Sequence, residues 1–261
     1  MKYALTLPSV YIDATKTSYR GKEYVLIGAL IVSCRNDIQR YFCQIRAKEN
    51  YFKELHFNDL STKEKSSSIV IKKFIDVLFT GECNFRALLI EDNKSILKGY
   101  FSGDEWKRKA ARINLLASYP FFTRDDIIFK HLLRPRIFID EENLCCEDEK
   151  KFKDYLIKKF ETPPVFNKGS IHLKDRPDPI IGFVDSKLLD QLQLVDVLLG
   201  CVRISYEHKD LHPTNAVKQD IFQHLLKGLN NKTKKGVVTL RGLNRRDTGG
   251  LINVWEYSSK V

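Results

Sequence analysis

Two aspartates in this chain directly follow short, strongly apolar segments. Asp13 comes after Val10–Ile12, and Asp140 comes after Ile137–Ile139. A carboxylate at the end of a buried strand reaches the rim of the sheet, where the binding sites of α/β proteins form. The alternative is that each acid caps the helix that follows its strand. For either residue alone the two interpretations are about equally good.

A third aspartate, Asp196, lies inside the almost continuous apolar stretch Leu188–Gly200. A helix through this stretch is apolar on nearly every face, so we expect the Asp196 side chain to be substantially buried. An unpaired carboxylate is costly to bury, and Asp196 therefore needs a cation or a strong hydrogen-bond partner. A metal ion and a buried Arg or Lys remain the two alternatives.

A fourth acid, Glu54, lies in the segment Lys53–Phe57 and, taken alone, fits the exposed position of a strand. Together the four acids are hard oxygen ligands from distant parts of the chain. Such a set suits Mg²⁺ or Mn²⁺ better than zinc. Two such ions can activate a water molecule and stabilise the leaving oxygen in phosphodiester hydrolysis. The four acids together therefore suggest a metal site.

The elements that would position these acids alternate between strands and helices. Apolar runs at 3–13 and 24–33 flank the polar segment Lys16–Lys22 and predict a hairpin. Further strands are predicted at Phe85–Glu91, Arg136–Asp140, 169–174 and 180–184, with a closing hairpin of Val237–Leu240 and Leu251–Tyr257. Three helices are predicted at 36–48, 147–160 and 215–229. Two more begin at the capping boxes Ser61–Glu64 and Ser102–Glu105, and another runs from a cap at Ser186 to about residue 207. This alternation predicts an α/β fold with a mixed central sheet flanked by helices.

The same acids carry a resemblance to a prokaryotic family, the domain of unknown function 3800 family. Its members open with a strand that ends in Tyr-Ile-Asp-Glu-Ser-Gly, and they end with a late helix of the type Leu-Gln-Leu-Ala-Asp-Leu-Leu-Gly. Four segments match the family in order: Tyr11–Asp13, Glu54–Phe57, Ile137–Glu141 and Leu192–Gly200. The residues Asp185–Lys187, shortly before the last segment, match as well. The late helix is the most specific match. The matches span residues 8–205.

The resemblance implies a ribonuclease H-like fold in which Asp13, Glu54, Asp140 and Asp196 hold the metal ions. It implies that Lys187 faces the scissile phosphate. This chain departs from the family at Ala14-Thr15, where the family usually has Glu-Ser, and at His56, where the family usually has Lys. The family's setting implies defence against phage or mobile elements, with a partner protein of such a system.

The composition fits a polyanionic substrate. The 261 residues include 44 Lys and Arg against 33 Asp and Glu, a formal net charge of +11. Such a surplus attracts nucleic acid, although a lysine-rich surface with no partner is an equally good interpretation of the charge alone. Substrate contacts are expected from Lys187, His56 and Arg203, with the basic loops Lys232–Lys235 and Arg241–Arg246 beside them.

The length fits one domain, 1–261, with 210–261 as a C-terminal helix and hairpin extension. The six cysteines form no CxxC pair, which argues against a zinc site or a disulfide framework. We expect a cytoplasmic protein, because no signal peptide and no membrane-spanning apolar run is evident.

The sequence therefore predicts a Mg²⁺- or Mn²⁺-dependent nuclease. Two alternatives remain. One is a catalytically silent module of the same fold that binds nucleic acid or a protein partner. The other is phosphoryl transfer on a nucleotide, for which the absence of a GxxxxGK[ST] motif excludes only the P-loop version.

Overall fold

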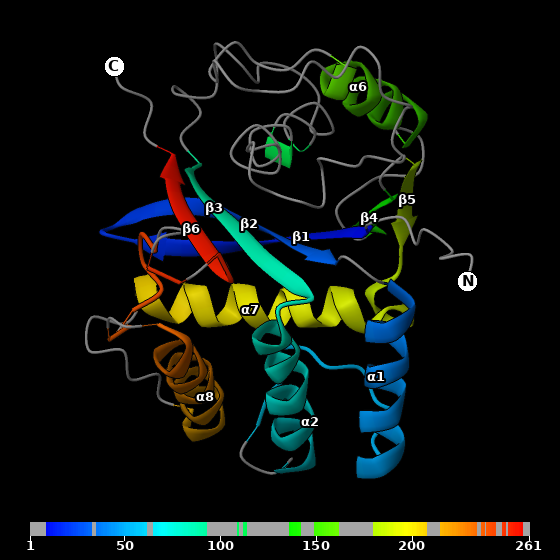
Figure 1. Ribbon diagram of the computed structural model, residues 1–261. Helices are drawn as coiled ribbons and strands as arrows, with labels where there is room; N and C mark the ends of the chain where they lie inside the picture. The colour runs from blue at the N-terminus through cyan, green and yellow to red at the C-terminus, as the bar shows by residue number, and fades with distance from the viewer. Residues whose placement is uncertain are drawn as a thin grey trace.

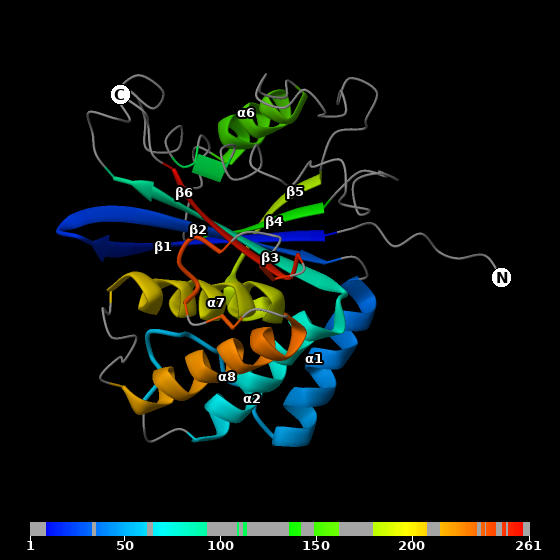
Figure 2. The ribbon, with the colours of Figure 1, turned by 60° about the vertical axis from the view of Figure 1, so that its left-hand side comes forward.

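The computed structural model of the chain describes residues 9–32, 35–61, 65–92, 109, 112–113, 136–141, 149–161, 180–207, 215–233, 236–237, 239–243, 247–248 and 250–257. They form a mixed six-stranded sheet with helices on both faces, an α/β architecture as predicted (Figures 1 and 2). In order across the sheet, the strands are β5 (Ile180–Val184), β4 (Arg136–Asp140), β1 (Ser9–Tyr19), β2 (Lys22–Val32), β3 (Cys83–Glu91) and β6 (Ile252–Tyr257).

Strands β1, β2 and β3 are antiparallel neighbours, whereas β4, β5 and β6 join the sheet through parallel pairings. The β1–β2 hairpin turns at Arg20 and Gly21, whose φ angles are 52° and 73°. Two successive left-handed residues match the right-handed twist of the flanking strands in a tight hairpin. The turn is therefore much shorter than the predicted polar segment Lys16–Lys22, because β1 continues through these residues to Tyr19.

The described helices are α1 (Arg35–Glu49), α2 (Lys65–Asp76), α6 (Glu149–Glu161), α7 (Asp190–Glu207) and α8 (Ala216–Lys232), with short 3₁₀ helices η1 (Val77–Thr80) and η5 (Ser186–Leu188). Helix α7 lies between the sheet and the outer helices α2 and α8 (Figures 1 and 2). This position explains why α7 is apolar nearly all round, since most of its residues are buried.

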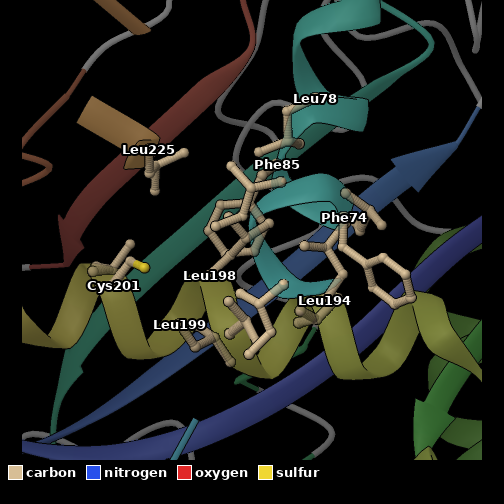
Figure 3. Packing of buried hydrophobic residues seen from close by; sticks show 14 of the residues in the cluster. Phe74, Leu78, Phe85, Leu194, Leu198, Leu199, Cys201 and Leu225 are labelled. Atoms are coloured by element: carbon tan, nitrogen blue, oxygen red, sulfur yellow. The ribbon is translucent and has the colours of Figure 1, made fainter. Parts of the chain in front are cut away.

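The larger hydrophobic core fills the space between the sheet and α1, α2, α7 and α8. Leu194, Leu198 and Leu199 of α7 pack there beside Phe74 of α2 and Phe85 of β3 (Figure 3). A second, smaller core lies on the opposite face of the sheet, where Phe152 and Leu156 of α6 cover the strands. The alternating residues of the central strands therefore face two different cores.

Three features of the C-terminal half differ from the prediction. The helix expected to start at Ser186 begins at Asp190, because η5 and an Asp185 cap precede it. Strand β6 pairs in parallel with β3 at the edge of the sheet. The predicted closing hairpin is wrong, since the described residues of 236–243 form no strand. The segments Thr62–Glu64, Ser102–Glu105 and 169–174 lie outside the described residues.

None of the described helices is long and apolar enough to cross a membrane.

Candidate functional site

Asp13 and Asp140 lie beside each other on the face of the sheet that α7 covers. Strands β1 and β4 pair in parallel with Ile12 opposite Ile139, and the pairing ends there. Tyr11 and Phe138, two residues earlier on each strand, stack their rings on the α7 side at 5.2 Å. Because side chains alternate along a strand, the two aspartates face the same side. Both are buried.

Asp13 does not end its strand as predicted, because β1 continues to Tyr19. It lies instead where the β1–β4 pairing ends, and its Oδ1 accepts a hydrogen bond from the Ala14 amide at 2.6 Å. Two carboxylates are therefore buried on neighbouring strands, and buried charges need compensating partners.

Asp196 lies close to the same part of the sheet. Gly28 is opposite Asp13 in the β1–β2 pairing, and a Cβ placed on Gly28 would lie 2.7 Å from Leu199 Cδ2. Helix α7 therefore crosses the strand pair at Leu199. Asp196 precedes Leu199 by three residues, slightly less than one helical turn. Asp13 and Asp196 thus occupy the same side of the sheet near one crossing point.

Glu54 and His56 lie in an irregular segment, residues 51–60, which has neither helical nor strand hydrogen bonds of its own. The prediction of a strand position for Glu54 is therefore wrong. The side chain of Arg46 donates to the backbone oxygens of Tyr51 and Lys53, at 3.2 and 2.8 Å. Backbone groups that lack secondary structure need such partners when they are buried.

Further along, the segment is held by α7 and by the start of α8. The Gln193 side chain accepts from the Leu55 amide at 2.9 Å, and Asp196 Oδ2 accepts from the Phe57 amide at 2.8 Å. Asn215, the N-cap of α8, donates to the Leu60 oxygen at 2.7 Å. Side chains from three helices therefore fix the position of Glu54 and His56.

The His56 ring stands between two of the predicted acids. Its Nε2 lies 3.1 Å from Glu54 Oε1, and its Nδ1 lies 3.3 Å from Asp196 Oδ2. The hydrogen bond with Asp196 is the main cause that raises the pKa of His56 to about 9, while partial burial acts in the opposite direction. The Ser186 hydroxyl donates to the same Glu54 oxygen at 3.1 Å. Glu54, His56, Asp196 and Ser186 therefore form one connected polar cluster.

The buried Arg that could have paired with Asp196 pairs with Asp190 instead. Arg46 and Asp190 form an ion pair of 2.6 Å, with about a tenth of each side chain exposed. The Arg46 Nη2 also donates to Gln193 Oε1 at 2.8 Å. Asp196 has no Arg or Lys within ion-pair distance among the described residues, and its partners are His56 and the Phe57 amide.

The cationic residues that were predicted to contact the substrate differ in exposure and in their partners. Lys187 is exposed beside the Ser186–Glu54 contact. Arg203 Nη2 donates to Asn58 Oδ1 at 2.6 Å, and its Nε lies 3.6 Å from Glu207. Arg241 donates to the Ser205 backbone oxygen and to Tyr19, so it anchors the end of α7 instead of facing solvent. Residues 234–235 and 244–246 of the basic loops lie outside the described residues.

A cavity reaches Asp13 from the opposite face of the sheet. Its volume is about 230 Å³, and its walls include Ile12, Val25 and Ile139 of the smaller core. Three cationic residues also line it: Lys16, Lys109 and Arg112. Arg112 pairs with Asp92 at 2.6 Å. The neighbourhood of Asp13 therefore combines apolar walls with positive charge.

Sequence reasoning missed four residues that shape this region: Arg46, Asn58, Gln193 and Lys218. Arg46 had a usable signal, because it continues the row Ile38 and Phe42 at helical spacing, on the face that α1 buries. Gln193 had one too, because it lies between Leu192 and Leu194 in the apolar stretch Leu188–Gly200. Asn58 and Lys218 lie in ordinary polar contexts, and nothing in their spacing distinguishes them.

The donor types fit a hard divalent cation, but no group of three or more His, Cys, Asp or Glu side chains within the described residues is arranged to hold one. Comparisons with protein families, with curated proteins and with solved structures found no match for the chain.

Proposed function

We propose that the chain is a metal-dependent nuclease with a ribonuclease H-like fold that hydrolyses phosphodiester bonds of DNA or RNA. The observation that carries this proposal is the common location of the acids. Asp13 and Asp140 face α7 from adjacent strands, and Asp196 lies near the point where α7 crosses them. Glu54 joins Asp196 through His56. The mixed sheet is compatible with the fold that the resemblance implies.

In this proposal Asp13, Glu54, Asp140 and Asp196 hold Mg²⁺ or Mn²⁺. When bound, the ions would activate water and stabilise the leaving oxygen. Glu54 and Asp196 each have an oxygen within 3.3 Å of the His56 ring. That ring must therefore move before the two carboxylates share an ion.

The residues of the chain have separate tasks in binding the substrate. Lys187 is exposed beside Glu54, where its ammonium group can reach a phosphate bound at the acids. Arg203 lies on the same helix as Asp196, two turns further on, where it would contact the sugar-phosphate backbone of the substrate next to the scissile bond. These positive groups offset the repulsion between phosphate and carboxylates.

A cleavage assay tests this proposal. The protein is incubated with single- and double-stranded DNA and RNA in the presence of Mg²⁺, Mn²⁺ or EDTA. We expect cleavage of at least one substrate with a metal and none with EDTA. Cleavage that persists in EDTA, or its absence under every condition, would contradict the proposal.

A second candidate is a catalytically silent module that binds nucleic acid or a protein partner. The contact of His56 with both carboxylates favours it, because a cationic side chain already balances Glu54 and Asp196. The cleavage assay combined with a binding measurement separates the two, since a silent nucleic-acid-binding module would bind oligonucleotides without cutting them. A place in defence against phage or mobile elements rests on the family resemblance alone.

A further inference from the structure

Two cations from different helices meet at a single residue next to the acidic cluster. Arg203 of α7 donates to Asn58 Oδ1 at 2.6 Å, and Lys218 of α8 donates to the Asn58 backbone oxygen at 3.0 Å. Asn58 directly follows Phe57, whose amide binds Asp196. The segment 51–60, which carries Glu54 and His56, therefore contacts both positive side chains at Asn58.

The surroundings of Lys218 leave its charge incompletely balanced. Its hydrogen-bond partner is a neutral carbonyl, and its ammonium group lies 5.3 Å from the centre of the Phe57 ring. Within the described part of the chain, no carboxylate lies within ion-pair distance of it. Burial and, after it, the nearby Arg203 lower the pKa of Lys218, while Asp59, Asp196 and Glu207 act against that shift at longer range. An anion at this position would stabilise the charged form.

The position of the pair relative to Asp196 indicates what kind of anion could bind. Arg203 lies seven residues beyond Asp196 on α7, which corresponds to roughly 10 Å along the helix axis. A phosphate at Arg203 and Lys218 is therefore not the scissile one. It is a phosphate further along the same strand of a polynucleotide.

We propose that Arg203 and Lys218, held by Asn58, form a subsite for a phosphate that flanks the scissile bond, so that the protein selects polynucleotides over single nucleotides. This inference rests on the proposed function. Arg203 supplies a planar donor group and Lys218 a point charge, a combination that suits a phosphate oxyanion.

The test is fluorescence anisotropy in EDTA with a labelled oligonucleotide about 12 nucleotides long, a length in the range of single-strand binding sites. We expect Lys218→Gln to weaken binding severalfold and to reduce the magnitude of the salt slope by about one. Lys218→Arg should retain binding. The matched control is Lys227→Gln, which removes the same charge from an exposed position on the same helix and should bind like the wild type. Thermal melting verifies that each variant is folded.

The outcomes separate the inference from the proposed function. If the wild type binds and cuts the oligonucleotide but Lys218→Gln and Lys227→Gln bind equally well, the subsite is refuted and the nuclease proposal stands. If the wild type cuts with a metal but binds no oligonucleotide in EDTA, the subsite alone is refuted. If it neither binds in EDTA nor cuts with Mg²⁺ or Mn²⁺, both are refuted. A loss confined to Lys218→Gln, restored by Lys218→Arg, supports the subsite.

Discussion

Two aspartates on α7 have opposite surroundings although both are largely enclosed by protein. Asp190 forms an ion pair with the buried Arg46, whereas Asp196 contacts a histidine and a backbone amide. A carboxylate that serves only the fold is expected to have the first kind of partner. The partners of Asp196 are therefore compatible with a role of this carboxylate in binding a cation or a substrate.

Replacement of Asp196 by Asn should separate folding from activity. The amide keeps the shape and can still accept from the Phe57 amide, but it loses the charge that would bind a metal ion. We expect nuclease activity to fall by orders of magnitude, because removal of one key catalytic electrostatic group commonly costs about 10²–10³ in kcat. The variant should still fold, but below about pH 9 its melting temperature should be lower than that of the wild type, because the His56 imidazolium loses its main partner. A variant that cuts at the wild-type rate would contradict a catalytic role for Asp196.

Asp190→Asn is the control for Asp196→Asn, because it makes the same substitution at an aspartate on the same helix that serves the fold. It leaves the Arg46 guanidinium buried without its counter-charge. The expected cost is about 3–5 kcal/mol of unfolding free energy. Denaturant titration measures it. A variant as stable as the wild type would show that Arg46 does not depend on Asp190.

The contact of His56 with Asp196 makes the stability of the metal-free protein depend on pH. The folded pKa of about 9 lies above the ordinary value of 6.5, because Asp196 first, and then Glu54 and Asp59, favour the imidazolium. A raised pKa contributes stability that is fully present below the ordinary pKa and is lost as the pH rises through the folded pKa.

The measurement compares the melting temperatures of wild type and His56→Gln in EDTA. The advantage of the wild type should be largest near about pH 6 and should shrink toward about pH 9.5, since deprotonation of His56 removes it. A difference that stays constant over this range would mean that His56 is not charged in the folded state.

At the scale of elements, the fit between α7 and the segment 51–60 depends on a small residue. A Cβ placed on Gly200 would lie 2.1 Å from the Phe57 ring. No real Cβ approaches a ring so closely, so a larger residue must displace Phe57. The amide of Phe57 binds Asp196, and His56 precedes it. The small residue therefore lets the loop reach the acids.

Gly200→Ala should impair both stability and the site. Overpacking of this kind costs about 1–3 kcal/mol, and the displaced loop should also lower nuclease activity. Gly228→Ala is the matched control, because the Cβ of this α8 residue would lie 2.2 Å from the ring of Phe79 in η1, in a contact that involves neither Asp196 nor residues 51–60. It should lose stability without losing activity per folded molecule. Equal activity losses in the two variants would contradict the positional role of Gly200.

Much of the fold could be predicted because hydrophobic periodicity decides which residues form elements. The predicted helices at 36–48 and 215–229 and the strand at Arg136–Asp140 agree with α1, α8 and β4. The C-terminal hairpin was wrong because apolar runs of similar length do not reveal which strands pair. Strand β6 pairs with β3, far away in sequence.

The site could be predicted only in part. Apolar flanks revealed Asp13, Asp140 and Asp196, since a carboxylate is conspicuous in such a segment. The position of Glu54 depends on side chains from α1 and α7 that hold an irregular segment. No local pattern encodes such contacts, which is why a plain strand position was the better interpretation of Glu54 taken alone.

At the scale of the whole molecule, the net charge of +11 allows two interpretations, a nucleic-acid partner or a merely lysine-rich surface. A salt series of oligonucleotide binding in EDTA separates them. If several cations contact phosphates, the affinity should fall by about 10³-fold or more between roughly 50 and 200 mM salt. Affinity that is independent of salt would favour the second interpretation.

The proposed metal site consists of four carboxylates from distant parts of the chain. The most direct measurement is a crystal structure of the protein soaked in Mn²⁺, with data collected at the manganese absorption edge. We expect anomalous density in contact with Asp13 and Asp196, with Asp140 and Glu54 beside it and the His56 ring turned away. Density bound elsewhere, or crystals that take up no Mn²⁺ while His56 stays between Glu54 and Asp196, would contradict it.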